Sequence, residues 1–302
     1  MARHVCFVVN SRANYARIKS TIAAAQERDD LQISIILGAS ALLYKYGNVA
    51  DLIKRDGFEV SAEVYTIVDG DKPVTMAKTT ALSILELSSQ FDRLKPDVVL
   101  TVADRYETLG TAIAASYMNI PLAHTQGGEI TGSIDESVRH ACTKLAHLHF
   151  PASQSAAKVL EQLGENPKHI YVTGCPSIDI AKNTKKEELG DILQRYSGVG
   201  PPIDASRAFL LVSQHPVTTE FLDAKSQILE TLKAIEEMGT QTIWLWPNVD
   251  SGSDAISKTL RTYREKTPNS KIHFYRNFSA EDYVNILRTT SCIIGNSSSG
   301  IR

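Results

Sequence analysis

The sequence predicts an α/β protein of two domains, each a doubly wound parallel β-sheet covered by helices. Short runs rich in Val, Ile, Leu and Phe alternate with longer segments of helical periodicity along the chain. The composition changes once, at 183–207, to charged residues followed by Gly and Pro. The 302 residues are enough for two cores. We therefore predict a Rossmann-like N-terminal domain at 1–182, a linker at 183–207 and a Rossmann-like C-terminal domain at 208–302.

The N-terminal domain is expected to begin with a strand rich in Val and Phe, which ends before the polar run 10–12. An Ala-rich helical pattern follows, and the same alternation repeats along the domain. Because strands that alternate with helices are joined by crossovers, the sheet should be parallel. The expected strands are 4–9, 32–37, 59–67, 97–102, 121–125, 148–150 and 170–173, and the expected helices are 15–28, 49–55, 74–94, 107–117, one starting near 133, and 153–164.

The C-terminal domain repeats the pattern with fewer elements. Its strands are expected at 209–212, 242–245, 271–274 and 291–294, and its helices at 220–238, 254–266 and 280–288. The last stretch, 295–302, reads as a loop followed by only the first residues of a helix. We therefore expect this domain to be incomplete at its C-terminal end.

The stretch 124–153 combines the end of a strand, a glycine-rich loop and the start of a helix. Ser133 and Glu136 have the S-x-x-E spacing of a capping box, so the loop should end at a helix N-terminus that favours negative charge. Titratable groups gathered in such a loop indicate a functional site, although a solvated loop before a well-capped helix is the alternative. The polar residues gathered here are His124, Gln126, Glu129, Asp135, Arg139 and His140.

Further polar residues follow the ends of the expected strands, where open α/β sheets bind their ligands. The chain has no G-x-G-x-x-G fingerprint, and the Ser-rich loop within 295–302 precedes the first residues of a helix. These two features favour a nucleotide-sugar diphosphate over a dinucleotide. The strand-end residues are Arg12, Asn14, Asp104, Arg105, Gln126, His215, Asn248, Asp250, Asn296, Ser297 and Ser298.

Charge and composition exclude several other classes of ligand. The formal net charge is −2, with basic and acidic residues spread along the chain, so we expect neither nucleic acid nor a membrane surface as partner. No apolar run approaches the about 20 residues of a membrane span, and we expect a cytoplasmic protein. The His147-x-His149 pair lacks a carboxylate or Cys at ligand spacing, so we expect no metal and no cofactor.

Nine short runs in the loops stand out when they are taken together. They are Ser11-Arg-Ala-Asn-Tyr15, Ala103-Asp-Arg-Tyr-Glu107, His124-Thr-Gln-Gly-Gly-Glu129, Gly132-Ser-Ile-Asp-Glu-Ser-Val-Arg-His140, Thr143-Lys-Leu-Ala-His147, Gly174-Cys-Pro-Ser177, His215-Pro-Val-Thr-Thr219, Pro247-Asn-Val-Asp250 and Gly295-Asn-Ser-Ser298. As a set they resemble the hydrolysing UDP-N-acetylglucosamine 2-epimerases, which make N-acetylmannosamine or a related sugar for sialic-acid-type biosynthesis. The resemblance implies a two-domain GT-B fold with its active site in the interdomain cleft. The non-hydrolysing branch differs at the first and seventh runs.

The resemblance also implies a reaction and a set of site residues. UDP is eliminated across C1 and C2 of the sugar to give a glycal, and water then adds with reprotonation at C2 from the other face. Asp104 and Asp135 match family catalytic carboxylates, and His215 matches a residue at the diphosphate. The implied substrate-binding residues are Arg12, Asn14, Arg105, Ser297 and Ser298 around the diphosphate, Asn248 and Asn296 nearby, and the backbone of Phe278 at the uracil.

One departure from the family pattern lies inside the glycine loop. The chain has Gln126 where the family has Glu, and Gln cannot accept a proton, so Glu129 is the candidate to replace it as a catalytic group. Two alternatives therefore stay open: a catalytically impaired nucleotide-sugar-binding protein, and a non-hydrolysing epimerase. Asp135 could also be only a helix-end charge, and Arg105 only a surface ion pair. We expect a UDP-sugar as partner and a homo-oligomer, either dimer or tetramer.

Overall fold

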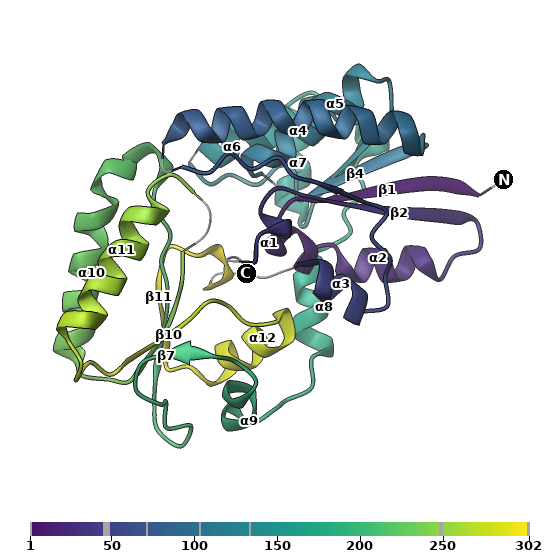
Figure 1. The fold of residues 1–302 in the computed structure, drawn as a ribbon. Coiled ribbons are helices and arrows are strands. Elements are labelled where there is room, and N and C mark those ends of the chain that lie inside the picture. The colour runs from purple at the N-terminus through teal and green to yellow at the C-terminus, as the bar shows by residue number, and fades with distance from the viewer. Residues whose placement is uncertain are drawn as a thin grey trace. The chain divides into compact units, whose positions relative to one another are not determined.

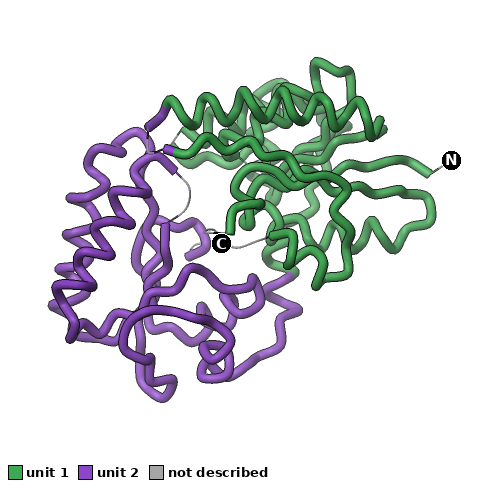
Figure 2. The backbone as a smooth tube through the Cα atoms, in the orientation of Figure 1, with its two compact units in different colours: residues 1–69, 74–179 green, residues 70–73, 180–302 purple. Residues whose placement is uncertain are grey.

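The computed structural model describes residues 2–44, 49–70, 72–102, 104–132, 134–247 and 250–300. The chain divides into two compact units, which Figure 2 shows in green and purple. The first unit comprises Met1–Asp69 and Val74–Asp179, and the second comprises Gly70–Pro73 and Ile180–Arg302.

The first unit contains a six-stranded parallel sheet with the strand order β3-β2-β1-β4-β5-β6. Figure 1 labels β1, β2 and β4 of this sheet. Successive strands are added on one side of β1 as far as β3, and on its other side from β4 onward. Open α/β sheets bind ligands at such a change of side, which is called the topological switch point. This unit therefore has the predicted doubly wound fold. Its strands are β1 (Arg3–Val9), β2 (Leu31–Gly38), β3 (Ala62–Val64), β4 (Val98–Val102), β5 (Leu122–Thr125) and β6 (Leu148–Phe150).

Helices cover both faces of this sheet because successive strand residues point to opposite sides. On β1, Phe7 and Val9 pack with residues of α2 and α3, whereas Cys6 and Val8 pack with residues of α4, α5 and α6. Both faces of the central strands are thus buried. The helical elements are α1 (Arg12–Ala16), α2 (Lys19–Gln26), η1 (Ala39–Leu42), α3 (Val49–Arg55), α4 (Pro73–Leu94), α5 (Tyr106–Tyr117), α6 (Ile134–Leu145), α7 (Gln154–Gln162), η3 (Pro167–His169) and α8 (Pro176–Asn183).

The second unit contains a five-stranded sheet with the order β11-β8-β9-β10-β7, in which only β7 is antiparallel to its neighbour. Helices α10 and α11 pack on one face, and α9 and α12 on the other. This unit repeats the Rossmann-like pattern. Its elements are α9 (Leu189–Gln194), β7 (Gly198–Val199), β8 (Leu210–Ser213), η4 (Thr218–Asp223), α10 (Ala224–Met238), β9 (Thr242–Leu245), α11 (Ser253–Lys266), β10 (Ile272–Tyr275), α12 (Ala280–Thr289), β11 (Cys292–Gly295) and η5 (Ser298–Gly300).

Several stretches differ from the sequence-based expectation: α8 was not expected, the helix expected at 15–28 is divided into α1 and α2, and the strand expected at 59–67 is only Ala62–Val64. Two further differences lie near the expected domain boundary. The expected strand at 170–173 is reduced to one isolated bridge between Ile170 and His149. The segment 183–207, expected as a linker, lies in the second unit and carries α9 and β7. Leu189 and Ile192 are buried in the core of that unit, because their i, i+3 spacing places both on one face of a short helix. A pattern of two apolar residues is too short to stand out in a charged stretch.

Candidate active site

The carboxyl ends of β1, β4 and β5 bring several expected site residues to one edge of the first sheet. Arg12 and Asn14 follow β1, Asp104 and Arg105 follow β4, and Gln126 follows β5. The three strands are parallel neighbours, so the loops after them lie side by side.

Asn14 connects the ends of β1 and β4 through its side chain. It is buried, its Oδ1 accepts from the backbone N–H of Asn10 at 3.2 Å, and its Nδ2 donates to the carbonyl of Val102 at 3.5 Å. Ser11 caps α1, since its Oγ accepts from the Asn14 N–H at 3.1 Å. Asn14 therefore fixes the loop that carries the half-buried Arg12.

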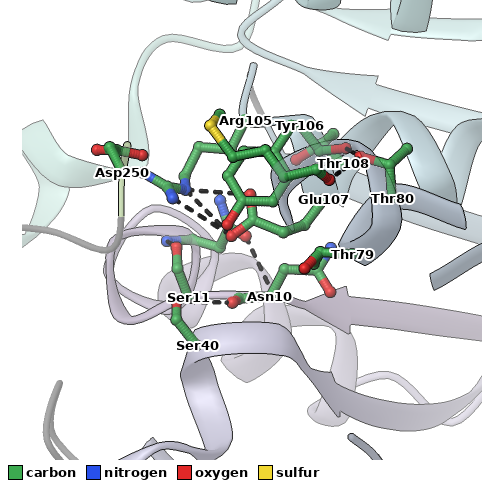
Figure 3. A network of polar contacts seen from close by, with 12 residues as sticks. Asn10, Ser11, Ser40, Thr79, Thr80, Arg105, Tyr106, Glu107, Thr108 and Asp250 are labelled. Carbon is green, nitrogen blue, oxygen red and sulfur yellow. Dashed lines mark hydrogen bonds and ion pairs between the residues drawn. The ribbon is translucent and has the colours of Figure 1, made fainter. Parts of the chain in front are cut away.

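Arg105 forms an ion pair inside the protein rather than on its surface. Its Nε lies 3.2 Å from Oε2 of Glu107, whose side chain is fully buried, while the Arg105 side chain is 15% exposed. Its guanidinium carbon also lies 5.4 Å from the ring centroid of Tyr106. Figure 3 shows the Arg105 guanidinium facing the Glu107 carboxylate, and the Thr80 hydroxyl donates to the Tyr106 carbonyl at 3.2 Å beside them. The local geometry of Arg105 is thus fixed by contacts on α5.

Asp104 is paired with Arg139, a residue that the sequence marked only as one of several polar groups. Nη2 of Arg139 donates to Oδ2 of Asp104, and the Arg139 side chain is 1% exposed. Nη1 of Arg139 donates to the carbonyl of Glu129 at 2.5 Å and to the hydroxyl of Thr131 at 3.4 Å. The pair thus joins the loop after β4 to the glycine loop. Helical spacing alone could not identify this partner, since the two residues are 35 positions apart.

Gln126 begins the glycine loop in a conformation that is rare for residues with a side chain. Its φ is +60°, it is 1% exposed, and its N–H donates to the carbonyl of Phe150 at 2.9 Å. Its amide Nε2 lies 3.6 Å from Sγ of Cys175. Gln126, which departs from the family pattern, is therefore buried. A carboxylate at this position would ionise only at a large cost in free energy unless it had a cationic partner.

The N-terminus of α6 is organised by Glu136. Its Oε2 accepts the backbone N–H groups of Gly132 at 2.7 Å and of Thr131 at 2.5 Å. These hydrogen bonds lower the pKa of the Glu136 carboxyl. Asp135 lies beside it in the first helical turn and is half-buried. Ser133, the other half of the expected capping box, lies outside the described residues.

In the second unit, His215 and Asn296 follow the neighbouring parallel strands β8 and β11. The Oδ1 of Asn296 accepts from the backbone N–H of His215 at 2.8 Å, and its Nδ2 donates to the His215 carbonyl at 2.9 Å. The Asn296 side chain therefore fixes the backbone of His215. Ser297 is bonded to Ser299 through their hydroxyls at 2.7 Å, and Ser298 begins η5.

Phe278 lies in an aromatic cluster that the sequence did not reveal. It is buried and contacts the rings of Tyr196 and Tyr275, at centroid distances of 4.7 Å and 4.9 Å. The Tyr196 hydroxyl donates to the buried Asp282 at 2.5 Å and accepts from the backbone N–H of Ser279 at 2.8 Å. Tyr196 belongs to the segment taken as a linker, so no sequence signal connected it with Phe278. Asn248 lies outside the described residues.

The described residues contain no group of three or more His, Cys, Asp or Glu side chains that could hold a metal ion. His147 is exposed, and Nε2 of the buried His149 lies 3.1 Å from Oε2 of Glu165. No helix within the described ranges is long and apolar enough to cross a membrane.

Comparison with known proteins gives one consistent result. The family model described as UDP-N-acetylglucosamine 2-epimerase matches residues 23–302. The UDP-N,N'-diacetylbacillosamine 2-epimerase (hydrolyzing) of Legionella pneumophila is 31% identical over 301 residues, which are 100% of this chain and 78% of that protein. The UDP-N-acetylglucosamine 2-epimerase of Neisseria meningitidis serogroup B is 28% identical over 302 residues, or 100% of this chain and 76% of the relative.

Solved structures show the same fold. The UDP-GlcNAc 2-epimerase from Neisseria meningitidis bound to UDP-GlcNAc has a TM-score of 0.75 at 16% identity, covering 97% of this chain and 78% of that one. The Methanocaldococcus jannaschii enzyme in complex with UDP-GlcNAc and UDP has a TM-score of 0.76 at 16% identity, covering 98% and 79%. The predicted fold class, two Rossmann-like domains of the GT-B type, is confirmed.

Proposed function

Because the chain belongs to the UDP-N-acetylglucosamine 2-epimerase family, we propose that it catalyses the hydrolysing 2-epimerisation of a UDP-acetamido sugar. The single observation that carries this proposal is the pairing at the switch point of the first sheet. There a buried Arg139 holds the Asp104 carboxylate next to Arg105 on the same loop. A fixed carboxylate beside an anion-binding guanidinium suits a substrate that carries a diphosphate next to the reacting carbons.

The reaction needs two proton transfers on opposite faces of the sugar ring. In the first step the C1–O bond breaks, UDP leaves with the bonding electrons, and a base removes the C2 proton to give the glycal. In the second step water adds at C1, and C2 receives a proton from the other face. Asp104 and Asp135 supply carboxylates that exchange protons or balance positive charge at the ring. Glu129 supplies the carboxylate that Gln126 lacks.

Each unit has basic or hydroxyl groups that suit the oxygens of a diphosphate. In the first unit Arg12 and Arg105 contact its oxygens, with Asn14 holding the backbone beside Arg12. In the second unit the phosphate ligands are His215, with its backbone held by Asn296, and the hydroxyls of Ser297 and Ser298. An imidazolium of His215 protonates or stabilises the leaving oxygen. Asn248 contacts the sugar or nucleotide, and the backbone of Phe278 contacts the uracil.

A different function is favoured by one feature, the buried Gln126 amide. If the proton transfer of the family requires a carboxylate at this position, the chain binds UDP-sugars without turning them over. The two candidates make opposite predictions for the same assay, because one releases UDP and the other only binds it.

The test supplies UDP-N-acetylglucosamine and UDP-N,N'-diacetylbacillosamine separately, and follows free UDP by chromatography and the sugar by NMR. Free UDP together with a released 2-epimerised sugar is the expected result. Binding without turnover indicates the impaired binding protein, and an epimerised UDP-sugar without free UDP indicates a non-hydrolysing enzyme. Asp104→Asn is the negative control, with an expected loss of about 10²–10⁴-fold in kcat.

A further inference from the structure

Arg139 is a fully buried cation with an unusual set of partners. Its side chain is 1% exposed, and an unpaired charge at such a depth would be strongly destabilising. Nη2 binds the carboxylate of Asp104, and Nη1 binds the Glu129 carbonyl and the Thr131 hydroxyl. Its Nε is buried and has no hydrogen-bond partner among the residues that the structure describes. All the bonds that it makes are therefore directed at the two loops that carry the proposed carboxylates.

Two side chains of α6 hold the glycine loop. Glu136 accepts the N–H groups of Thr131 and Gly132, and Arg139 donates to the carbonyl of Glu129. The two residues are three positions apart on α6 and so lie on the same face of the helix. One helix face thus fixes both the donor and the acceptor groups of the loop, and Arg139 extends this contact to Asp104.

Stability alone does not explain a buried ion pair at this place. Replacing such a pair by well-packed apolar residues is often neutral or stabilising. Cys142, three positions further along the same helix face, is fully buried. Its burial, and to a smaller extent the charge of Asp104, raises the pKa of its thiol to about 12. This face of α6 therefore accommodates an uncharged buried side chain one turn from Arg139. The charge of Arg139 is thus not needed for packing, and we look for its role in the site.

We propose that Arg139 is a positioning residue of the reaction, which holds the Asp104 carboxylate in one orientation relative to the glycine loop. It acts through Asp104, because its buried guanidinium donates to the Asp104 carboxylate and to the Glu129 carbonyl. This inference rests on the proposed function, in which Asp104 is a catalytic carboxylate. A planar guanidinium bonds to several fixed acceptors at once, whereas an ammonium does not reproduce that geometry.

The test is a double-mutant cycle on the whole chain with Arg139→Met, Asp104→Asn and the double variant, scored by the kcat and KM of UDP release. Arg139→Met is expected to lower kcat by about 10²-fold, the size of effect that a misplaced catalytic group produces. KM and the calorimetric affinity for UDP should change by less than about threefold. In the Asp104→Asn background, Arg139→Met should lower kcat by no more than about threefold, because coupled residues are not additive.

Arg139→Lys keeps the positive charge but loses the planar set of guanidinium donors, so its kcat should lie between those of wild type and Arg139→Met. If Arg139→Met fails to fold, as circular dichroism would show, Arg139→Lys takes its place in the cycle. Lys144→Met is the matched control, because Lys144 lies on the same helix and its ion pair with Glu165, at 2.6 Å, points elsewhere. This control should leave kcat unchanged.

The outcomes separate the inference from the proposed function. If the wild type releases UDP but the Arg139 variants have unchanged kcat, or lose the same factor with and without Asp104, the positioning role is wrong and the proposed function stands. If the wild type releases no UDP, the proposed function is wrong and the inference falls with it. A loss of kcat that disappears in the Asp104→Asn background supports both.

Discussion

We expect Gly128→Ala to destabilise the first unit more than Gly132→Ala, although each adds one methyl group to the same loop. Gly128 has φ +81°, and a Cβ built there would lie 2.2 Å from the carbonyl oxygen of Ala156 on α7. Gly132 has φ +68°, and a Cβ there meets no atom of the described residues within 4 Å. Both substitutions force a side chain into the left-handed region, but only the first also pushes the loop against a helix backbone.

The two contributions can be separated by magnitude. A left-handed conformation costs an L-residue about 1–2 kcal/mol, which both variants should show. Forcing a methyl group into filled space costs about 1–3 kcal/mol more, which only Gly128→Ala should show. We therefore expect a destabilisation of about 2–5 kcal/mol for Gly128→Ala, against about 1–2 kcal/mol for Gly132→Ala. The larger value is a substantial part of the stability of an ordinary domain, about 5–15 kcal/mol.

Urea unfolding followed by far-UV circular dichroism measures the difference. Both tryptophans, Trp244 and Trp246, lie in the second unit, so their fluorescence follows that unit separately. The Gly128→Ala variant should also lose more of its UDP release, because Gly128 lies between Gln126 and Glu129. Equal destabilisation by the two substitutions would refute the reasoning, since it would mean that the contact with Ala156 is absent or relaxes freely.

Three further predictions concern the proton-transfer groups, the pH dependence of stability and the aromatic cluster. Glu129→Gln should abolish UDP release while Gln126→Glu leaves it within about tenfold, and a hundredfold gain in the second variant would instead favour the impaired binding protein. Burial lowers the pKa of His149 from 6.5 more than the nearby Glu165 raises it, so the unfolded chain binds more protons below about pH 6.5. Stability measured by urea unfolding should therefore fall as the pH drops below that value, and His149→Gln should flatten this slope. Tyr196→Phe leaves the buried Asp282 carboxylate and the half-buried Ser279 N–H with one partner fewer each. It should destabilise the second unit by about 1–3 kcal/mol in the tryptophan-fluorescence transition, whereas an unchanged midpoint would contradict the assigned hydrogen bonds.

The sequence by itself predicted most of the fold and the family. The strands β1, β4 and β5 were expected within a few residues of their observed ends, because a buried strand and an amphipathic helix leave different periodicities in neighbouring residues. Polar residues directly after those strands marked the edge of the sheet where the loops meet. The family match over 23–302 confirms the resemblance of the loop motifs to the UDP-N-acetylglucosamine 2-epimerases. The roles of the individual site residues stay proposals.

Only the tertiary structure decided which charges are buried and what they bind. The sequence could not distinguish the buried pair of Arg105 and Glu107 from a surface ion pair, because both have the same short spacing. It gave no reason to connect Asp104 with Arg139, or Tyr196 with a carboxylate 86 positions away. Periodicity reports the environment of neighbouring residues along one element. Burial and pairing depend instead on how strands and helices far apart in the chain pack together, and that packing sets the strength of each charge interaction.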